Sequence, residues 1–138
     1  MNKTPLGVFV SLKTDLDTAV MQITAALKTE GFGVLTEIDV KETMKKKLGV
    51  EFRPYKILGA CNPNLANQVL TIAPETGLLL PCNVTVSQIA DGVEIGFIDP
   101  LAMLGVVNNP ALQPIAAEAR ARLERVAAVL EEKNHATL

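Results

Sequence analysis

The only two cysteines of the chain lie in two short segments that nearly mirror each other, Cys61-Asn62-Pro63 and Pro81-Cys82-Asn83. A thiol beside a carboxamide and a proline can form a reactive or ligand-binding corner, because a thiolate is both a nucleophile and a metal ligand. We therefore select four residues as the candidate binding site: Cys61, Asn62, Cys82 and Asn83.

The two sulfurs allow several interpretations, which the sequence alone leaves open. In the leading one, they mark a non-enzymatic module that binds a small molecule or a partner. In the second, a thiol-dependent enzyme or redox protein uses Cys61, activated by a helix N-terminus, as the attacking thiol and Cys82 as the resolving thiol. In the third, both sulfurs bind a metal ion or haem. Buried packing also accounts for them, since free cysteine often behaves as a small buried hydrophobe.

Little else in the chain favours catalysis. The single histidine, His135, lies in the C-terminal tail, where it is a poor candidate for the positioned base that a nucleophilic cysteine needs. No phosphate loop, dinucleotide-binding fingerprint, nucleophile elbow or zinc-protease motif occurs. Two thiols also fall short of the four ligands of a structural zinc site. We therefore predict no catalytic residues, no metal ligand set and no cofactor.

A basic run, Lys45-Lys46-Lys47, lies close in sequence to Lys41, Arg53 and Lys56. Such a run usually forms a solvated helix face. It can instead gather an anion if it lies near the helix N-terminus at Asn62-Pro63, where free backbone N–H groups attract negative charge. An anionic ligand is therefore a second ligand class to consider.

Length and charge limit the other possibilities. The chain of 138 residues fits one domain, 1–138, with a core of about 6–130 and a flexible C-terminal tail, 134–138. The net charge of −2 argues against a nucleic-acid partner, and no apolar run approaches the roughly 20 residues that span a bilayer. Residues 6–12 alternate like a strand rather than a signal peptide. We expect a cytoplasmic protein with reduced cysteines.

Hydrophobic periodicity predicts the elements that must position these residues. Strands are expected at 6–12, 33–38, 55–61 and 79–90, with a fifth after the turn signal Asp91-Gly92. Helices are expected from an N-cap at Thr14 to a stop at Gly31, then at 40–48, about 63–73, 100–105 and about 110–133. In the second strand, Val34, Thr36 and Ile38 are expected on one face.

Local signals sharpen this prediction. Asn62-Pro63, Asp99-Pro100 and Asn109-Pro110 each place a good N-cap before a proline at the first helical position. A two-residue hairpin loop at Asp91-Gly92 pairs Ala90 with Val93 and Val86 with Phe97. On the long C-terminal helix, Glu118 and Arg122 have the spacing of an ion pair.

The order βαβαβαββα with at least one antiparallel hairpin predicts an α+β fold. A single mixed or antiparallel sheet of about five strands has its helices packed mainly on one face. The opposite face is expected to show Phe9, Leu35, Leu58 and Ile89. A half-apolar, uncovered sheet face is often a dimer surface, so we expect a homodimer.

The content and order of these motifs resemble a known family. The strand Tyr55–Cys61 with its Asn62-Pro63 step, the segment 77–84 with its proline–cysteine step, and the upstream strand 33–40 together resemble the domain of unknown function 302 family. The similarity covers roughly residues 6–130. It implies a small, dimeric α+β domain of a bacterial or archaeal cytoplasm, and it implies no activity or catalytic residues.

Overall fold

Six antiparallel strands form one sheet in the order β1-β2-β6-β5-β4-β3. The structure is a computed structural model that describes residues 1–136, with side chains as far as Asn134. Within this part of the chain the predicted α+β class is confirmed. The prediction of about five strands is close to the six observed; the additional strand, β1, has two residues and is too short to show periodicity.

The elements follow the predicted order closely. The strands are β1 (Asn2–Lys3), β2 (Gly7–Leu12), β3 (Gly33–Asp39), β4 (Tyr55–Cys61), β5 (Cys82–Ile89) and β6 (Gly92–Ile98). The α-helices are α1 (Leu16–Thr29), α2 (Val40–Leu48), α3 (Pro63–Ile72), α4 (Pro100–Gly105) and α5 (Gln113–Ala136). Two 3-10 helices, Pro74–Leu78 and Pro110–Leu112, precede β5 and α5.

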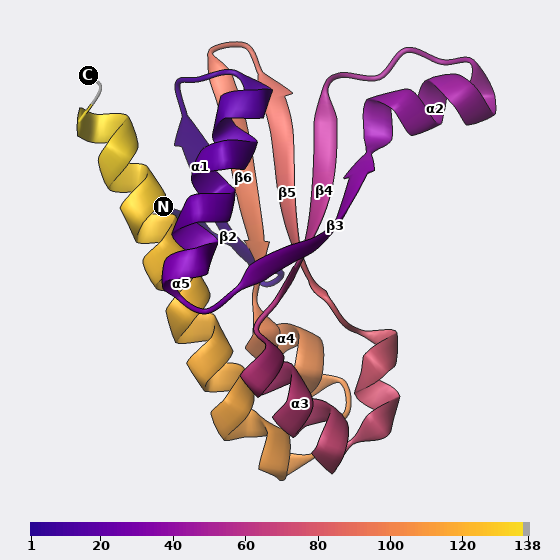
Figure 1. Cartoon of the computed structure of the whole chain (residues 1–138), viewed down its shortest axis with the longest axis vertical. Coiled ribbons are helices and arrows are strands. Elements are labelled where there is room, and N and C mark those ends of the chain that lie inside the picture. The colour runs from indigo at the N-terminus through magenta and orange to yellow at the C-terminus, as the bar shows by residue number, and fades with distance from the viewer. Residues whose placement is uncertain (137–138) are drawn as a thin grey trace.

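Helices α1 and α5 cover one face of the sheet, whereas α3 and α4 lie beyond one end of it (Figure 1). The main hydrophobic cluster fills the layer between the sheet and α1 and α5, with side chains such as Ile95, Phe97, Ile23 and Leu123. A second, smaller cluster joins α3, α4 and the first turns of α5 around Val69, Leu104 and Leu112. The fold therefore has two apolar clusters, one on the sheet and one beyond its end.

The predicted helix starts are confirmed at all three proline steps. The side chains of Asn62, Asp99 and Asn109 accept hydrogen bonds from the backbone N–H groups of Leu65, Leu101 and Ala111. The predicted cap of the first helix is wrong by one residue. Asp15, not Thr14, caps α1, because its carboxylate accepts bonds from both the backbone and the hydroxyl of Thr18.

The hairpin between β5 and β6 is present, but its predicted register is wrong by two residues. Val86 pairs with Ile95, and Ile89 pairs with Gly92. Gly92, at φ +131°, therefore begins β6 instead of belonging to the loop. A shift by two leaves every side chain on its predicted face, because side chains alternate with a period of two. The predicted strand 79–90 also begins later, at Cys82.

A β-bulge in β3 overturns the prediction that Val34, Thr36 and Ile38 share a face. The register skips Leu35, so that Val34 pairs with Ala60 and Thr36 pairs with Gly59. Val34 packs against the main cluster, whereas Thr36 and Ile38 point to the opposite face. The extra residue, Leu35, is left 66% exposed.

The face of the sheet that points away from α1 and α5, here called the open face, differs from its predicted composition. Leu58 does not belong to it, since it is 0% exposed in the main cluster. The strand alternation places these side chains on the open face: Phe9, Ser11, Tyr55, Ile57, Thr85, Ser87, Ile89 and Glu94.

The last turns of α5 contact the N-terminal part of the chain. The N-terminal ammonium group pairs with Glu131, and Asn134 Oδ1 accepts a bond from the backbone N–H of Lys13 at 2.9 Å. Helix α5 thus continues into the segment predicted as a flexible tail, although residues 137–138 of that segment lie outside the described part. Among the described helices, none is both long and apolar enough to cross a membrane.

Candidate functional site

Asn62 lies where the end of β4 passes into α3, and it is buried, with 7% of its surface exposed. Its Oδ1 accepts a bond from the N–H of Leu65 at 3.2 Å, which caps α3. Its Nδ2 donates to the backbone carbonyl of Glu30 at 3.3 Å, which ties the cap to the end of α1. Each end of the carboxamide therefore makes one bond within the protein, and these two bonds fix the position of Asn62.

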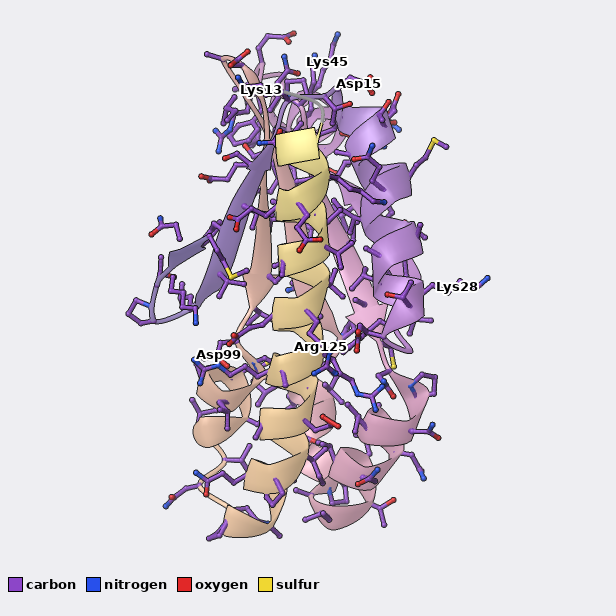
Figure 2. The ribbon with its side chains drawn as sticks, turned by 90° about the vertical axis from the view of Figure 1, so that its left-hand side faces the viewer. Lys13, Asp15, Lys28, Lys45, Asp99 and Arg125 are labelled. Carbon is purple, nitrogen blue, oxygen red and sulfur yellow. The ribbon has the colours of Figure 1, made fainter. Side chains whose placement is uncertain are left out.

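The end of α1 is a junction for three helices. The carbonyl of Glu30 also accepts a bond from Arg122 Nη1 at 3.0 Å. Arg125, labelled in Figure 2, lies on the next turn of α5. It binds Glu30 Oε1 through Nε at 3.2 Å and through Nη2 at 2.9 Å. The guanidinium of Arg125 lowers the pKa of the Glu30 carboxyl. The predicted pair of Glu118 with Arg122 is confirmed, at 3.8 Å.

Gly31 leaves room for this junction. Its φ is +80°, which favours glycine, and a Cβ atom at this position would lie 2.9 Å from Asn62 Nδ2. A side chain here would therefore displace the carboxamide that caps α3.

Cys61 and Cys82 lie on neighbouring strands but not side by side. Cys82 pairs with Ala60, one residue before Cys61, and successive strand residues point to opposite faces. Both cysteines are free thiols. The arrangement therefore supplies no disulfide and no adjacent sulfur pair.

The predicted activation of Cys61 by the helix N-terminus is wrong. Burial raises the pKa of the half-buried Cys61 thiol instead of lowering it. Burial, and to a smaller extent the nearby Cys61, raises the pKa of Cys82 to about 11. Desolvation of the thiolate is the main cause at both positions, and it favours the protonated sulfur at neutral pH.

Three of the four candidate residues, Cys61, Asn62 and Cys82, line one cavity of about 330 Å³. Asn83 does not line it, because it is exposed and pairs with Gly59 on the open face. The cavity walls come from the strand ends and from α3, α4 and α5. Their main contributions are Phe32, Leu65, Ala66, Val69, Leu80, Pro81, Met103, Leu104, Ile115 and Ala119.

The cavity lies where the two hydrophobic clusters meet. Phe32 and Ala60 belong to the main cluster, whereas Val69 and Leu104 belong to the smaller one. The predicted helix at about 63–73 contains the α3 residues of the cavity wall, whereas the predicted helix 100–105 was not expected to form another wall. The local signal for this wall is the apolar pair Met103-Leu104, which lies within the helix that the Asp99-Pro100 step begins.

The basic run does not lie near this cavity. Helix α2 projects from the end of the molecule opposite to α3 and α4 (Figure 1), and Lys45 lies at the same end as Lys13 and Asp15 (Figure 2). Lys46 pairs with Glu42, and Lys56 pairs with Glu37. The predicted combination of this run with the Asn62-Pro63 helix N-terminus is therefore wrong.

The described residues hold no group of three or more histidine, cysteine, aspartate and glutamate side chains that could bind a metal ion. The side chain of His135, which the sequence places in the C-terminal tail, lies outside the described residues. The titratable side chains that line the cavity are its two thiols.

Comparison with known proteins identifies one family. Residues 8–130 match a family model described as "Domain of unknown function DUF302". The chain is also similar to a solved structure described as an uncharacterised conserved DUF302 protein from Bacillus stearothermophilus. The two share 35% sequence identity and a TM-score of 0.82, over 89% of this chain and 96% of that one. No curated protein matches the chain.

Replacement of Asn62 by alanine tests the junction. We expect Asn62→Ala to lower the free energy of unfolding by about 1–2 kcal/mol, because α3 loses its cap and Glu30 loses one of its two donors. Urea unfolding measures the change. The control is Asn64→Ala, an exposed position two residues on, for which we expect a change within about 0.5 kcal/mol. Equal effects of the two variants would contradict the role assigned to Asn62.

The raised pKa values predict slow thiol reactions. At pH 8, Cys82 in the folded protein should react with a disulfide reagent at least about 100-fold more slowly than in urea, because each pKa unit lowers the thiolate fraction about tenfold. Cys61 should also react more slowly folded than unfolded, and its rate should keep rising with pH above the range of an ordinary thiol. Cys61→Ser and Cys82→Ser assign the two phases. A folded Cys61 that reacts faster than the unfolded chain would restore the activated-thiol hypothesis.

Proposed function

Because the chain belongs to the DUF302 family, whose description assigns no activity, we propose its function from its cavity: the protein binds a small, neutral, mostly apolar molecule between the sheet end and helices α3, α4 and α5. The observation that supports this is a single cavity lined by three of the four candidate residues, Cys61, Asn62 and Cys82. Its volume of about 330 Å³ lies within the range of small-molecule sites, about 300–1,000 Å³.

The cavity lining favours a neutral ligand. It contains no aspartate, glutamate, lysine, arginine or histidine, and both of its thiols have raised pKa values. A charged group brought into such a site would lose its hydration without gaining a partner. The Asn62 carboxamide makes one bond at each end within the protein. The Cys61 thiol and the remaining donor and acceptor of Asn62 are therefore the polar side-chain groups that a ligand can meet.

Binding, rather than catalysis, also fits the state of the thiols. A nucleophilic cysteine needs a thiolate or a base beside it. Burial keeps both sulfurs protonated, and the cavity lining provides no base. The cavity therefore supports a carrier or sensor of an apolar molecule.

A matched pair of probes tests this proposal. We expect 1-hexanol to shift the backbone amide resonances of Cys61, Ala66 and Met103, and hexanoate, with a hydrocarbon chain of similar length, to bind at least about tenfold more weakly because its charge must be buried. Amide NMR titration measures both. Ala66→Phe, which fills the cavity, should abolish the hexanol shifts, whereas Ala102→Phe on the exposed side of α4 should keep them. Equal binding of the two probes, or shifts that survive Ala66→Phe, would overturn the proposal.

We also propose that the protein is a homodimer. The open face carries half-buried Phe9, Tyr55 and Ile57 with no covering helix among the described elements, and α2 contains no buried residue. A nine-residue helix is only marginally stable in water by itself, so α2 is a natural element to gain contacts from a partner.

Light scattering at micromolar concentration tests the dimer. The expected mass is twice that of the 14.8 kDa chain. A mass equal to that of one chain across the accessible concentrations would refute it.

A further inference from the structure

We propose that the second copy docks on the open face, where Arg53 of each protomer meets Glu94 of the other. This inference rests on the proposed homodimer and assigns its surface. The two side chains, Arg53 and Glu94, lie close together on the open face and have no ionic partner in the described part of the chain.

Arg53 is held in place by three neighbours. Its guanidinium carbon lies 4.8 Å from the ring centre of Phe52 and 5.3 Å from that of Tyr55, within the range of cation–π contacts. Its Nε donates a hydrogen bond to Ser87 Oγ at 2.8 Å. These contacts leave both Nη groups as donors on a side chain whose orientation is already fixed, which lowers the entropy cost of binding a carboxylate.

Glu94 supplies the matching charge. It pairs across the sheet with Ser87, the same residue that binds Arg53, so the two charged side chains start from neighbouring positions on the open face. The Glu94 side chain is exposed, and within residues 1–134 its carboxylate makes no hydrogen bond or ion pair. The Arg53 guanidinium likewise has no carboxylate partner there. Neither charge is satisfied inside one protomer.

A two-fold interface suits this arrangement. In such an interface each patch meets its own copy, so a residue that contacts a second residue is contacted by it in return. An acidic and a basic side chain side by side are self-complementary under that symmetry, and two Arg53–Glu94 pairs would form at once. Arginine and aromatic side chains are also enriched at protein interfaces, which fits the Phe52–Arg53–Tyr55 group.

The surface beside this charged group is apolar. The next row across the sheet runs from Phe9 over Gly96 to Thr85, Ile57 and Ile38. Gly96 lets the ring of Phe9 lie flat on the sheet, since a Cβ atom there would be 2.5 Å from the ring. Ile38 is 49% exposed at the edge of this row. In the proposed dimer, this apolar strip lies beside the Arg53–Glu94 pairs. Such an arrangement has the composition of an interface core with a polar rim.

Charge reversal tests the assignment. We expect Arg53→Glu and Glu94→Arg each to weaken the dimer at least about tenfold, because each sets like charges against each other across the two-fold axis. The double variant Arg53→Glu/Glu94→Arg restores opposite charges and should recover most of the affinity. Glu75→Arg, the same charge change at an exposed position in the 3-10 helix before β5, is the control and should leave the dimer unchanged. Analytical ultracentrifugation measures the dissociation constants, and thermal unfolding confirms that each variant is folded.

The outcomes separate this inference from the proposed homodimer. If the wild-type protein sediments as one chain, both are wrong. If it sediments as a dimer whose dissociation constant is unchanged in folded Glu94→Arg and Arg53→Glu, the dimer stands and this surface is wrong. Loss in both single variants without recovery in the double variant would also contradict the direct pairing of Arg53 with Glu94.

Discussion

The backbone carbonyl of Glu30 is the point on which the arrangement of the helices depends. It accepts hydrogen bonds from Asn62 at the start of α3 and from Arg122 in the middle of α5, while the Glu30 side chain binds Arg125. A carbonyl has two lone pairs, and here both are used by groups from distant parts of the sequence. The end of α1 thereby fixes the start of α3 against α5, and these two helices are walls of the cavity.

The cavity lies between two separate clusters of apolar residues. One cluster packs the sheet against α1 and α5, and the other holds α3 and α4 to the first turns of α5. Asn62 connects this cavity with the Glu30 junction, because it lines the cavity between the clusters and also binds the Glu30 carbonyl. The space between the clusters is bounded by strand ends whose residues, Cys61 and Cys82, contribute small polarisable side chains instead of larger ones.

The sequence predicted those features of the fold that depend on residues close together in the chain. Alternation, helical spacing and the Asn-Pro and Asp-Pro steps placed most elements within a few residues, since these signals act over one or two turns. The features that it missed depend on contacts between distant segments: the bulge at Leu35, the hairpin register and the burial of Leu58 under the helices. The raised pKa of Cys61 also depends on contacts between distant segments. A helix N-terminus can be read locally, but the apolar walls that desolvate the thiol come from several elements.

The bulge at Leu35 also affects how the sheet ends. A sheet with two free edges can recruit further strands without limit, which leads to fibres and insoluble material. Here one edge is the two-residue strand β1, and the other is β3, whose regular ladder is interrupted after Val34. Neither edge offers a long, flat template for another strand. Short and bulged edge strands are features that disfavour strand-to-strand association, even where an apolar side chain such as Leu35 is exposed at the margin of the sheet.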